Sequence, residues 1–253
     1  MIKTYNETEI KKIRTACEVA AECLALLKNS VQPGMTTEEL DMIAMNFLSE
    51  RRVRPAFLGY RGYPKALCVS INEEVVHGIP SKNRVIRSGD IVSLDIGTEI
   101  DGYYGDTATT VPVGNVDNSI KELIATGSFS LEQAIEKAAA GNRLYDVSSA
   151  VQEIAEKKGY SVVREFVGHG IGSKLHEEPQ IPNFGTPGTG PILEEGMVFA
   201  IEPMVNMGTF KIEVLEDNWT AVTMDGKPSV HFEHTVVVRK NKGEILTWPK
   251  KRD

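Results

Sequence analysis

Four carboxylates interrupt apolar stretches that are otherwise typical of buried β-strands; they are Asp95, Asp106, Glu202 and Glu233. Asp95, for example, stands in the run IVSLDIG, and Glu202 stands in the run VFAIEPMV. A buried carboxylate without a partner costs several kcal/mol or becomes neutral through a raised pKa. Arginines are scarce near these positions in the sequence. The chain can therefore bury these strands only in a fold that brings the acids to basic partners or to cations.

The first two acids lie on neighbouring strands of a predicted hairpin. Asp101 and Gly102 form an Asp-Gly pair, which favours a two-residue turn between antiparallel strands. With these residues in the turn, Asp106 faces Gly97 across the hairpin, and Asp95 lies diagonally beside Asp106 on the same face. Their Cβ atoms are then within about 7–8 Å of each other. Both side chains could therefore reach one metal centre.

A histidine and several glycines accompany the acids. His169 stands between glycines in the run GHGIG, and glycines let the backbone approach a site closely. We expect Gly97 and Gly105 to leave room for the metal. Two aspartates, two glutamates and one histidine form an oxygen-rich donor set that suits Mn, Fe, Co or Zn, and four carboxylates balance two divalent cations. For any one acid taken alone, a capped turn or a salt bridge is the simpler interpretation.

Helical patterns occur twice along the chain. Apolar residues spaced three and four positions apart predict two helices in each half, over residues 10–27, 36–48, 120–139 and 147–154. A glycine breaks each pair, and a shift of 107 residues places Gly34 on Gly141 and Leu40 on Val147. We interpret this as a weak internal duplication, although helical periodicity alone produces many such matches.

Strand-like segments follow each helical pair; they are residues 66–71, 91–100, 103–111, 161–166, 197–205, 219–223 and 231–239. Runs of helices followed by runs of strands predict an α+β protein with an antiparallel sheet. We expect the turn-rich stretches 179–190 and 206–208 to be loops. Neither a GxGxxG nor a Walker sequence occurs, so nothing supports a nucleotide-binding fold.

Length and composition exclude several classes of protein. A chain of 253 residues can bury a sizeable core, and three cysteines are too few for a disulfide framework. The first residues lack the apolar stretch of a signal peptide, and no run reaches the roughly 20 apolar residues of a membrane span. The net charge of -7 disfavours binding to DNA and to nucleic acids in general. We therefore expect a soluble, cytoplasmic protein that makes no membrane contact.

Taken together, the motifs resemble those of the type I methionine aminopeptidases in their short bacterial form. The matching segments are DIG at 95–97, GDTA at 105–108, GHGIG at 168–172, HEEP at 176–179, EPM at 202–204 and EHT at 233–235. The resemblance runs from about Ile10 to the C-terminus. It implies the pita-bread fold, an α+β fold with pseudo-twofold duplicated halves, a central antiparallel sheet and flanking helices. We expect one catalytic domain over 1–253, with halves of about 1–115 and 116–253.

The resemblance assigns the acids and the histidine to two divalent metal ions, which could be Co, Mn, Fe or Zn. It implies that Asp95 binds one ion, and that His169 and Glu202 bind the other. Asp106 and Glu233 would bridge both ions. A water between two such ions is acidified toward neutral pH and becomes a ready nucleophile, here for the bond after an N-terminal methionine.

Three catalytic residues also follow from the resemblance. Glu202 is the expected proton shuttle. His77 and His176 are placed beside the substrate amide and the developing oxyanion. The resemblance gives no such role to His231 and His234, and we interpret them as packing groups or as neighbours of the metal ligands.

The methionine side chain requires an apolar slot, which the resemblance assigns to Tyr60, Tyr63, Cys68 and Trp219. Aromatic and sulfur side chains favour contact with a thioether. The sequence departs from the family pattern at Phe57, where many relatives carry cysteine, at Leu175, where an aromatic residue is common, and at His231, where glutamine is usual. The bulk of Phe57 should narrow the mouth of the slot, and cysteine-directed reagents that act there on relatives should fail here.

Partners and alternatives complete the prediction. By resemblance, the substrates are nascent polypeptides with a small second residue, met near the ribosomal exit tunnel by a monomeric enzyme. The basic segment 239–253 is a candidate contact for ribosomal RNA, and a solvated tail is the simpler alternative. Other functions remain open: a proline-specific aminopeptidase or dipeptidase of the same fold, a non-catalytic binding relative, or a one-iron redox enzyme, whose usual site has two histidines and one carboxylate.

Overall fold

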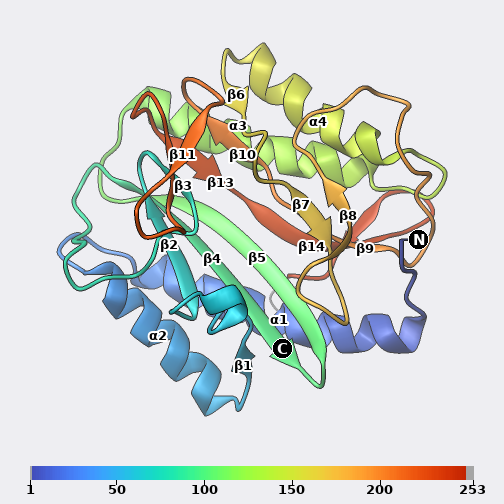
Figure 1. Cartoon of the computed structure of the whole chain (residues 1–253), viewed down its shortest axis with the longest axis horizontal. Helices are drawn as coiled ribbons and strands as arrows, with labels where there is room; N and C mark the ends of the chain where they lie inside the picture. The colour runs from blue at the N-terminus through green and yellow to red at the C-terminus, as the bar shows by residue number, and fades with distance from the viewer. Residues whose placement is uncertain (1, 249–253) are drawn as a thin grey trace.

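Two pairs of helices flank a large sheet in the computed structural model, which describes residues 2–248 (Figure 1). The helices are α1 (Glu7–Ser30), α2 (Thr37–Glu50), α3 (Asn118–Lys137) and α4 (Leu144–Lys157). A capping box begins each of the first two: the Asn6 side chain accepts from the first turn of α1, and Thr36 does the same for α2. The four predicted helices are confirmed, with ends that differ by a few residues.

The helices α2 and α4 occupy equivalent positions in the two halves of the chain. Both span 14 residues, and the 107-residue shift found in the sequence places the first and last residues of one on those of the other. Gly34 and Gly141, which the same shift pairs, have φ angles of 93° and 92°. Glycine adopts this conformation without steric cost. The predicted duplication is confirmed.

Fifteen strands within residues 2–248 form three sheets whose paired strands are all antiparallel. The large sheet contains β1 (Arg54–Pro55), β2 (Leu67–Ile71), β4 (Ile91–Ile100), β5 (Tyr103–Pro112), β7 (Gly168–Gly170), β8 (Glu177–Ile181), β9 (Val198–Ile201), β14 (Glu233–Val238) and β15 (Gly243–Ile245). The two small sheets contain β6 (Ser161–Val162), β10 (Met204–Asn206) and β13 (Ser229–His231), and β3 (Glu74–Val76), β11 (Ile212–Val214) and β12 (Ala221–Thr223). The predicted α+β class is confirmed.

The large sheet is symmetric about its central pair, β5 and β14 (Figure 1). The strand β4 pairs with the outer side of β5, as β9 pairs with the outer side of β14. Beyond them, β2 pairs with β4 as β7 pairs with β9. Each half of the chain therefore contributes equivalent strands to the centre, and this is the pseudo-twofold arrangement of the pita-bread fold.

Helices cover one face of the sheet and leave the other face for a site. One hydrophobic core packs α1 and α2 against β2 and β4 and includes Leu40 and Leu94, and another packs α3 and α4 against β9 and β14 and includes Leu123 and Phe199. Within residues 2–248, no helix is long and apolar enough to cross a membrane.

Two glycines of the central hairpin serve packing. A Cβ at Gly105 would lie 2.5 Å from the backbone nitrogen of Cys17 in α1, and a Cβ at Gly97 would lie 2.6 Å from the ring of Phe57. Both distances are far below an ordinary carbon contact. The expectation that these glycines leave room for a metal is therefore wrong: the helix and the aromatic ring occupy that space.

Two predicted strands are each divided in the structure. The strand predicted over 197–205 becomes β9 and β10, which join different sheets, because Pro203 has no N–H with which to continue the ladder. The strand predicted over 231–239 becomes β13 and β14, which also belong to different sheets and are separated by Phe232. Glu202 is therefore not within a strand, and it lies in the break between β9 and β10.

Shorter elements differ more from the prediction. The strand predicted over 161–166 is confined to β6, and the one predicted over 219–223 is confined to β12. Part of the stretch 179–190, expected as loop, belongs to β8, and Asn206 belongs to β10. No pattern in the sequence predicts β1, β3, β7, β8, β11 or β15, since most of them have only two or three residues, too few for an alternating pattern to appear.

Candidate metal centre and active site

The β4–β5 hairpin holds the two aspartates in the predicted register. Gly97 faces Asp106, and Asp95 faces Ala108. Both turn residues, 101 and 102, have positive φ angles, as the two-residue turn that joins twisted antiparallel strands requires. The local turn chemistry therefore sets the relative position of the two carboxylates.

Both aspartates point away from α1. The Thr98 hydroxyl of β4 donates to the Ala16 carbonyl of α1 at 2.8 Å, and Gly105 of β5 faces the same helix. Because side chains alternate along a strand, Asp95 and Asp106 lie on the opposite face. They are 9% and 3% exposed, so the fold buries both carboxylates on the face that the helices leave free.

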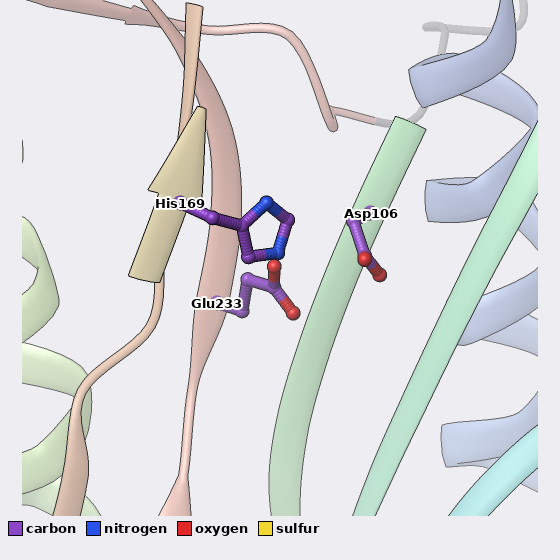
Figure 2. A group of neighbouring side chains, drawn as sticks. All are labelled: Asp106, His169 and Glu233. Atoms are coloured by element: carbon purple, nitrogen blue, oxygen red, sulfur yellow. The ribbon is translucent and has the colours of Figure 1, made fainter. Parts of the chain in front are cut away.

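Donors from three strands converge beside this hairpin. Glu233 begins β14 and lies opposite Ala108 of β5, and His169 is the middle residue of β7. Figure 2 shows the His169 imidazole beside the Glu233 carboxylate, with Asp106 across from them on β5. One ligand atom from each of these three residues lies within 4.8 Å of the other two. A single metal ion could therefore contact all three.

Glu202 joins the group from the break between β9 and β10. Its Oε1 atom lies 3.5 Å from Nε2 of His169, and its Oε2 atom lies 3.5 Å from Nε2 of His231. The structure thus places His231 next to a predicted ligand. His234 points elsewhere, with Nδ1 at 2.9 Å from the Thr247 hydroxyl.

Among residues 2–248, no lysine or arginine pairs with any of the four carboxylates. Within residues 2–248, the ion pairs of lysine and arginine all involve other acids. One buried oxygen in each of Asp95, Asp106 and Glu233 has no hydrogen-bond partner. Unpartnered carboxylate oxygens beside an imidazole nitrogen are the donors that ions such as Mn, Fe, Co and Zn accept. The residues therefore fit divalent metal ions.

Burial raises the pKa values of all four acids. Burial raises the pKa of Asp106 to about 7. Burial, followed by the charges of neighbouring carboxylates, raises the pKa values of Asp95, Glu202 and Glu233 well above their usual range. A cation at the centre would oppose this effect by favouring the charged carboxylates.

His176 and His77 line the same site. The His176 ring stacks on Tyr60 with 5.1 Å between centroids, and its Nδ1 atom lies 2.9 Å from the Tyr60 hydroxyl. Its centroid is 4.1 Å from that of His169. His77 has a φ of 62° and meets the Phe166 ring edge-on at 5.1 Å. Burial lowers the pKa of His77 to about 4 and is the main cause that lowers the pKa of His176 to about 3. Both imidazoles are therefore neutral near pH 7.

One cavity of about 140 Å³ unites these groups with the predicted apolar slot. Its lining is Phe57, Tyr60, Arg61, Tyr63, Cys68, His77, Asp95, Asp106, His169, Leu175, His176, Glu202, Trp219 and Glu233. Every residue predicted for the site is among them. The volume is well below the roughly 300–1,000 Å³ of small-molecule pockets and suits a single amino-acid side chain.

Arg61 is the lining residue that sequence reasoning missed. It lies in the short 3-10 turn η1 (Tyr60–Gly62), with a left-handed φ of 49°. An exposed arginine in a turn has no periodic pattern, and no feature of one sequence shows in which direction its side chain points. Only its place between the aromatic residues at 60 and 63 gave a signal that it could lie at the site.

Hydrogen bonds and a ring contact fix Tyr63 in the apolar wall of the cavity. The Tyr63 hydroxyl lies 3.1 Å from the Leu67 carbonyl and 3.0 Å from the Gly78 carbonyl, and its ring meets Trp219 edge-on at 5.0 Å. Cys68 of β2 lies directly opposite Asp95 in the sheet. The slot therefore adjoins the acids through the pairing of two neighbouring strands.

Fold and site together define a metal-dependent peptidase. The family model described as Metallopeptidase family M24 matches residues 11–240. The chain belongs to this family, which uses divalent metal ions.

Within the family, the chain is similar over nearly its whole length to methionine aminopeptidases. The methionine aminopeptidase of Clostridium perfringens is 49% identical, and that of Clostridium acetobutylicum is 47% identical; each match covers 98% of this chain and 99% of that protein. The crystal structure of methionine aminopeptidase from Thermotoga maritima superposes with a TM-score of 0.96 at 48% identity, covering 98% of this chain and 99% of that one.

More distant structures share the fold alone. The prolidase from Pyrococcus furiosus superposes with a TM-score of 0.79 at 24% identity, and the match covers 98% of this chain but 66% of that chain. This likeness agrees with the pita-bread architecture. At 24% identity, the likeness supports no conclusion about the substrate.

Proposed function

We propose that this protein is a metal-dependent methionine aminopeptidase, which removes the N-terminal methionine from nascent polypeptides whose second residue is small. The observation that carries the proposal is one cavity in which five candidate metal ligands adjoin an apolar slot of side-chain size. Similarity to methionine aminopeptidases over nearly the whole chain supports it.

The proposal assigns the five donors to two divalent ions, Co, Mn, Fe or Zn. Asp95 would hold one ion, and His169 with Glu202 would hold the other. Asp106 and Glu233 would lie between them. When bound, such ions acidify a water molecule and polarise the scissile carbonyl.

Three side chains handle protons and charge in this proposal. Glu202 acts as general base: its carboxylate accepts a proton from the attacking water and returns it to the departing amine. His77 and His176, which are neutral, donate ring N–H groups to the substrate amide and the developing oxyanion. A hydrogen bond from the Tyr60 hydroxyl to Nδ1 of His176 would leave the proton of that ring on Nε2.

The apolar slot would position the first residue of the substrate. Tyr63, Cys68 and Trp219 offer aromatic and sulfur surfaces to a thioether, and Phe57 and Leu175 complete the lining. Tyr63 is 3% exposed and fixed by hydrogen bonds, so the slot changes little when the side chain enters. A preformed slot of this size favours an unbranched side chain over a bulkier one.

The experiment that tests the proposal is metal removal and restoration. The purified protein is treated with a chelator, assayed on Met-Ala-Ser, and titrated with Mn, Fe, Co or Zn, while bound metal is counted by elemental mass spectrometry. We expect no cleavage in the stripped protein and recovery that follows metal content up to two ions per chain. Full activity without metal would overturn the proposal.

A proline-specific aminopeptidase is the second candidate, because such enzymes share this fold. Parallel assays on Met-Ala-Ser and Ala-Pro peptides separate the two activities. Cleavage of Ala-Pro in preference to Met-Ala-Ser would replace the proposed function by this one. Metal binding without cleavage of either peptide would favour a non-catalytic binding relative.

We further propose that the protein acts in the cytoplasm as a monomer near the ribosomal exit tunnel. The basic tail that motivated a ribosomal RNA contact ends in residues 249–253, which lie outside the described residues. Cosedimentation with ribosomes at increasing salt tests the contact, and we expect deletion of 250–253 to weaken it. No change on deletion would contradict the contact, and light scattering would reveal any state other than a monomer.

A further inference from the structure

A charged groove adjoins the active-site cavity. It has a volume of about 720 Å³ and is lined by Lys3, Arg61, Val167, Gly168, His169, Ser173, Lys174, His176, Glu177, Glu178 and Gln180. Three of these residues, Arg61, His169 and His176, also line the cavity. The two spaces therefore meet at these residues, and a peptide that extends from the cavity into the groove passes Arg61.

Arg61 supplies a cation at this junction. Its guanidinium carbon lies 5.5 Å from the centroid of the Tyr60 ring, and within residues 2–248 it forms no hydrogen bond or ion pair. Lys3, by contrast, donates to the Ser173 hydroxyl at 3.0 Å and lies over the Tyr5 ring at 4.2 Å. Lys174, the third cation of the groove, does not line the cavity, so Arg61 is the cation that borders both spaces.

The acidic residues of the groove do not neutralise Arg61. The Glu177 carboxylate accepts hydrogen bonds from the Tyr5 hydroxyl at 2.8 Å, the Ser173 hydroxyl at 2.8 Å and the Lys174 backbone N–H at 2.9 Å. Glu178 lines the groove but not the cavity. The junction therefore presents a positive charge, although the catalytic centre behind it is rich in carboxylates.

We propose that Arg61 makes the enzyme select substrates by the charge of their third residue, so that an acidic side chain there is favoured over a basic one. This inference rests on the proposed function. With methionine in the slot, the third residue of an extended chain lies about 7 Å further on, and the proposal places it in the groove that Arg61 borders. A guanidinium can pair with a carboxylate through two parallel hydrogen bonds, and it repels a lysine at the same place.

The test uses the metal-loaded enzyme and C-terminally amidated pentapeptides Met-Ala-Xaa-Ala-Ala, with Glu, Gln or Lys as Xaa. Amidation removes the terminal carboxylate, which Arg61 could otherwise bind in a short peptide. We expect Arg61→Gln to lower the ratio of kcat/KM for the Glu peptide to that for the Lys peptide by roughly three- to tenfold, mainly through KM, as a partly exposed ion pair allows. Arg61→Glu should lower it further, and added salt should shrink the ratio in the wild type.

The test compares a ratio of kcat/KM values because a loss of activity that is common to all peptides leaves this ratio unchanged. Arg52→Gln is the matched control: Arg52 is another exposed arginine with a positive φ, 57°, and it lies outside both the cavity and the groove. Its ratio should equal that of the wild type, and Arg61→Lys should retain most of the wild-type preference.

Each outcome separates this inference from the proposed function. An Arg61→Gln ratio equal to that of the wild type, with the Gln peptide still cleaved, overturns the role of Arg61 and leaves the proposed function intact. A preference that persists when Glu is moved to the fifth position overturns the assignment to the third residue. Cleavage of none of the peptides counts against the proposed function itself.

Discussion

At the scale of single residues, Asp106 belongs to the candidate metal centre. Its carboxylate lies within reach of both His169 and Glu233, and one of its buried oxygens has no hydrogen-bond partner. We expect Asp106→Asn to fold normally, because it removes a charge that burial opposes, but to lose bound metal and at least about 100-fold in activity. Elemental analysis after dialysis and kcat/KM on Met-Ala-Ser measure both effects.

Asp101→Asn is the matched control for this change. It makes the same substitution on the same hairpin, at an exposed turn residue whose φ of 51° asparagine tolerates. Metal content and activity should remain at wild-type levels. Equal metal binding by the two variants would contradict the assignment of Asp106 as a ligand.

Thiol chemistry gives a second prediction at this scale. All three cysteines are buried, and Cys68, which is 5% exposed, is the one that lines the cavity. Because position 57 is a phenylalanine and offers no thiol, cysteine-directed reagents aimed at that position should not inhibit this protein. Mass mapping of adducts checks the mechanism: slow inhibition should follow modification of Cys68, and inhibition with Cys68 unmodified would disprove it.

At the scale of elements, the N-terminal segment supports the loop that carries His176. The Tyr5 hydroxyl accepts from the Ser173 backbone N–H and donates to the Glu177 carboxylate, each at 2.8 Å. We expect Tyr5→Phe to loosen residues 172–177 and to lower kcat/KM several-fold, with a smaller change in thermal stability, because the ring still fills its buried place.

Tyr103→Phe is the control for Tyr5→Phe. Tyr103 is half-buried at the start of β5, and no hydrogen bond of its hydroxyl is observed within residues 2–248. Tyr103→Phe also removes one hydroxyl, and it should leave kcat/KM unchanged. A comparable loss of activity in both variants would show that the effect of Tyr5 is not specific to this loop.

The start of α4 yields a prediction about pH. Asp146 accepts hydrogen bonds from the backbone N–H groups of Arg143 at 2.8 Å and Gly188 at 2.7 Å, and these lower its pKa. Asp146→Ala should cost about 1 kcal/mol at pH 7. Because the folded pKa lies below the unfolded value of 3.8, this contribution is complete above about pH 5 and is lost as the pH falls through the folded pKa.

Calorimetry at several pH values checks this sign. The difference in Tm between the wild type and Asp146→Ala should stay constant from about pH 5 to pH 8 and narrow in more acidic solution. If the difference in Tm instead grew with acidity, the hydrogen bonds accepted by the Asp146 carboxylate could not be its origin.

At the scale of the whole molecule, the candidate metal ligands come from both halves of the chain. Asp95 and Asp106 lie on the β4–β5 hairpin, and His169, Glu202 and Glu233 follow the second helical pair. A metal ion that contacts ligands from both halves should therefore stabilise the fold as a unit. At 100 times its Kd it would add about 2.7 kcal/mol, or roughly 5–10 °C in Tm for a protein of this size.

Calorimetry of the stripped protein with and without Mn measures this stabilisation. The Asp106→Asn variant should show a much smaller increase in Tm, and a variant with Asp101→Asn should behave as the wild type. An unchanged Tm in the wild type at saturating metal would contradict a centre shared by the two halves.

Local features of the sequence determined much of this protein. The four helices, the register of the β4–β5 hairpin and the identity of the buried acids follow from spacing, turn chemistry and residue type, all of which act between residues close together in the chain. The duplication was also visible, because the 107-residue shift preserves the pattern of α2 in α4.

Only the tertiary structure decided the rest. Strands of two or three residues, such as β7, exist because distant partners pair with them, and Glu202 reaches the site because β9 and β10 belong to different sheets. The packing of Gly105 against Cys17 and the position of Arg61 between cavity and groove likewise depend on segments far apart in the sequence. A single sequence records the period of an element, but contacts between distant elements decide which of its residues meet.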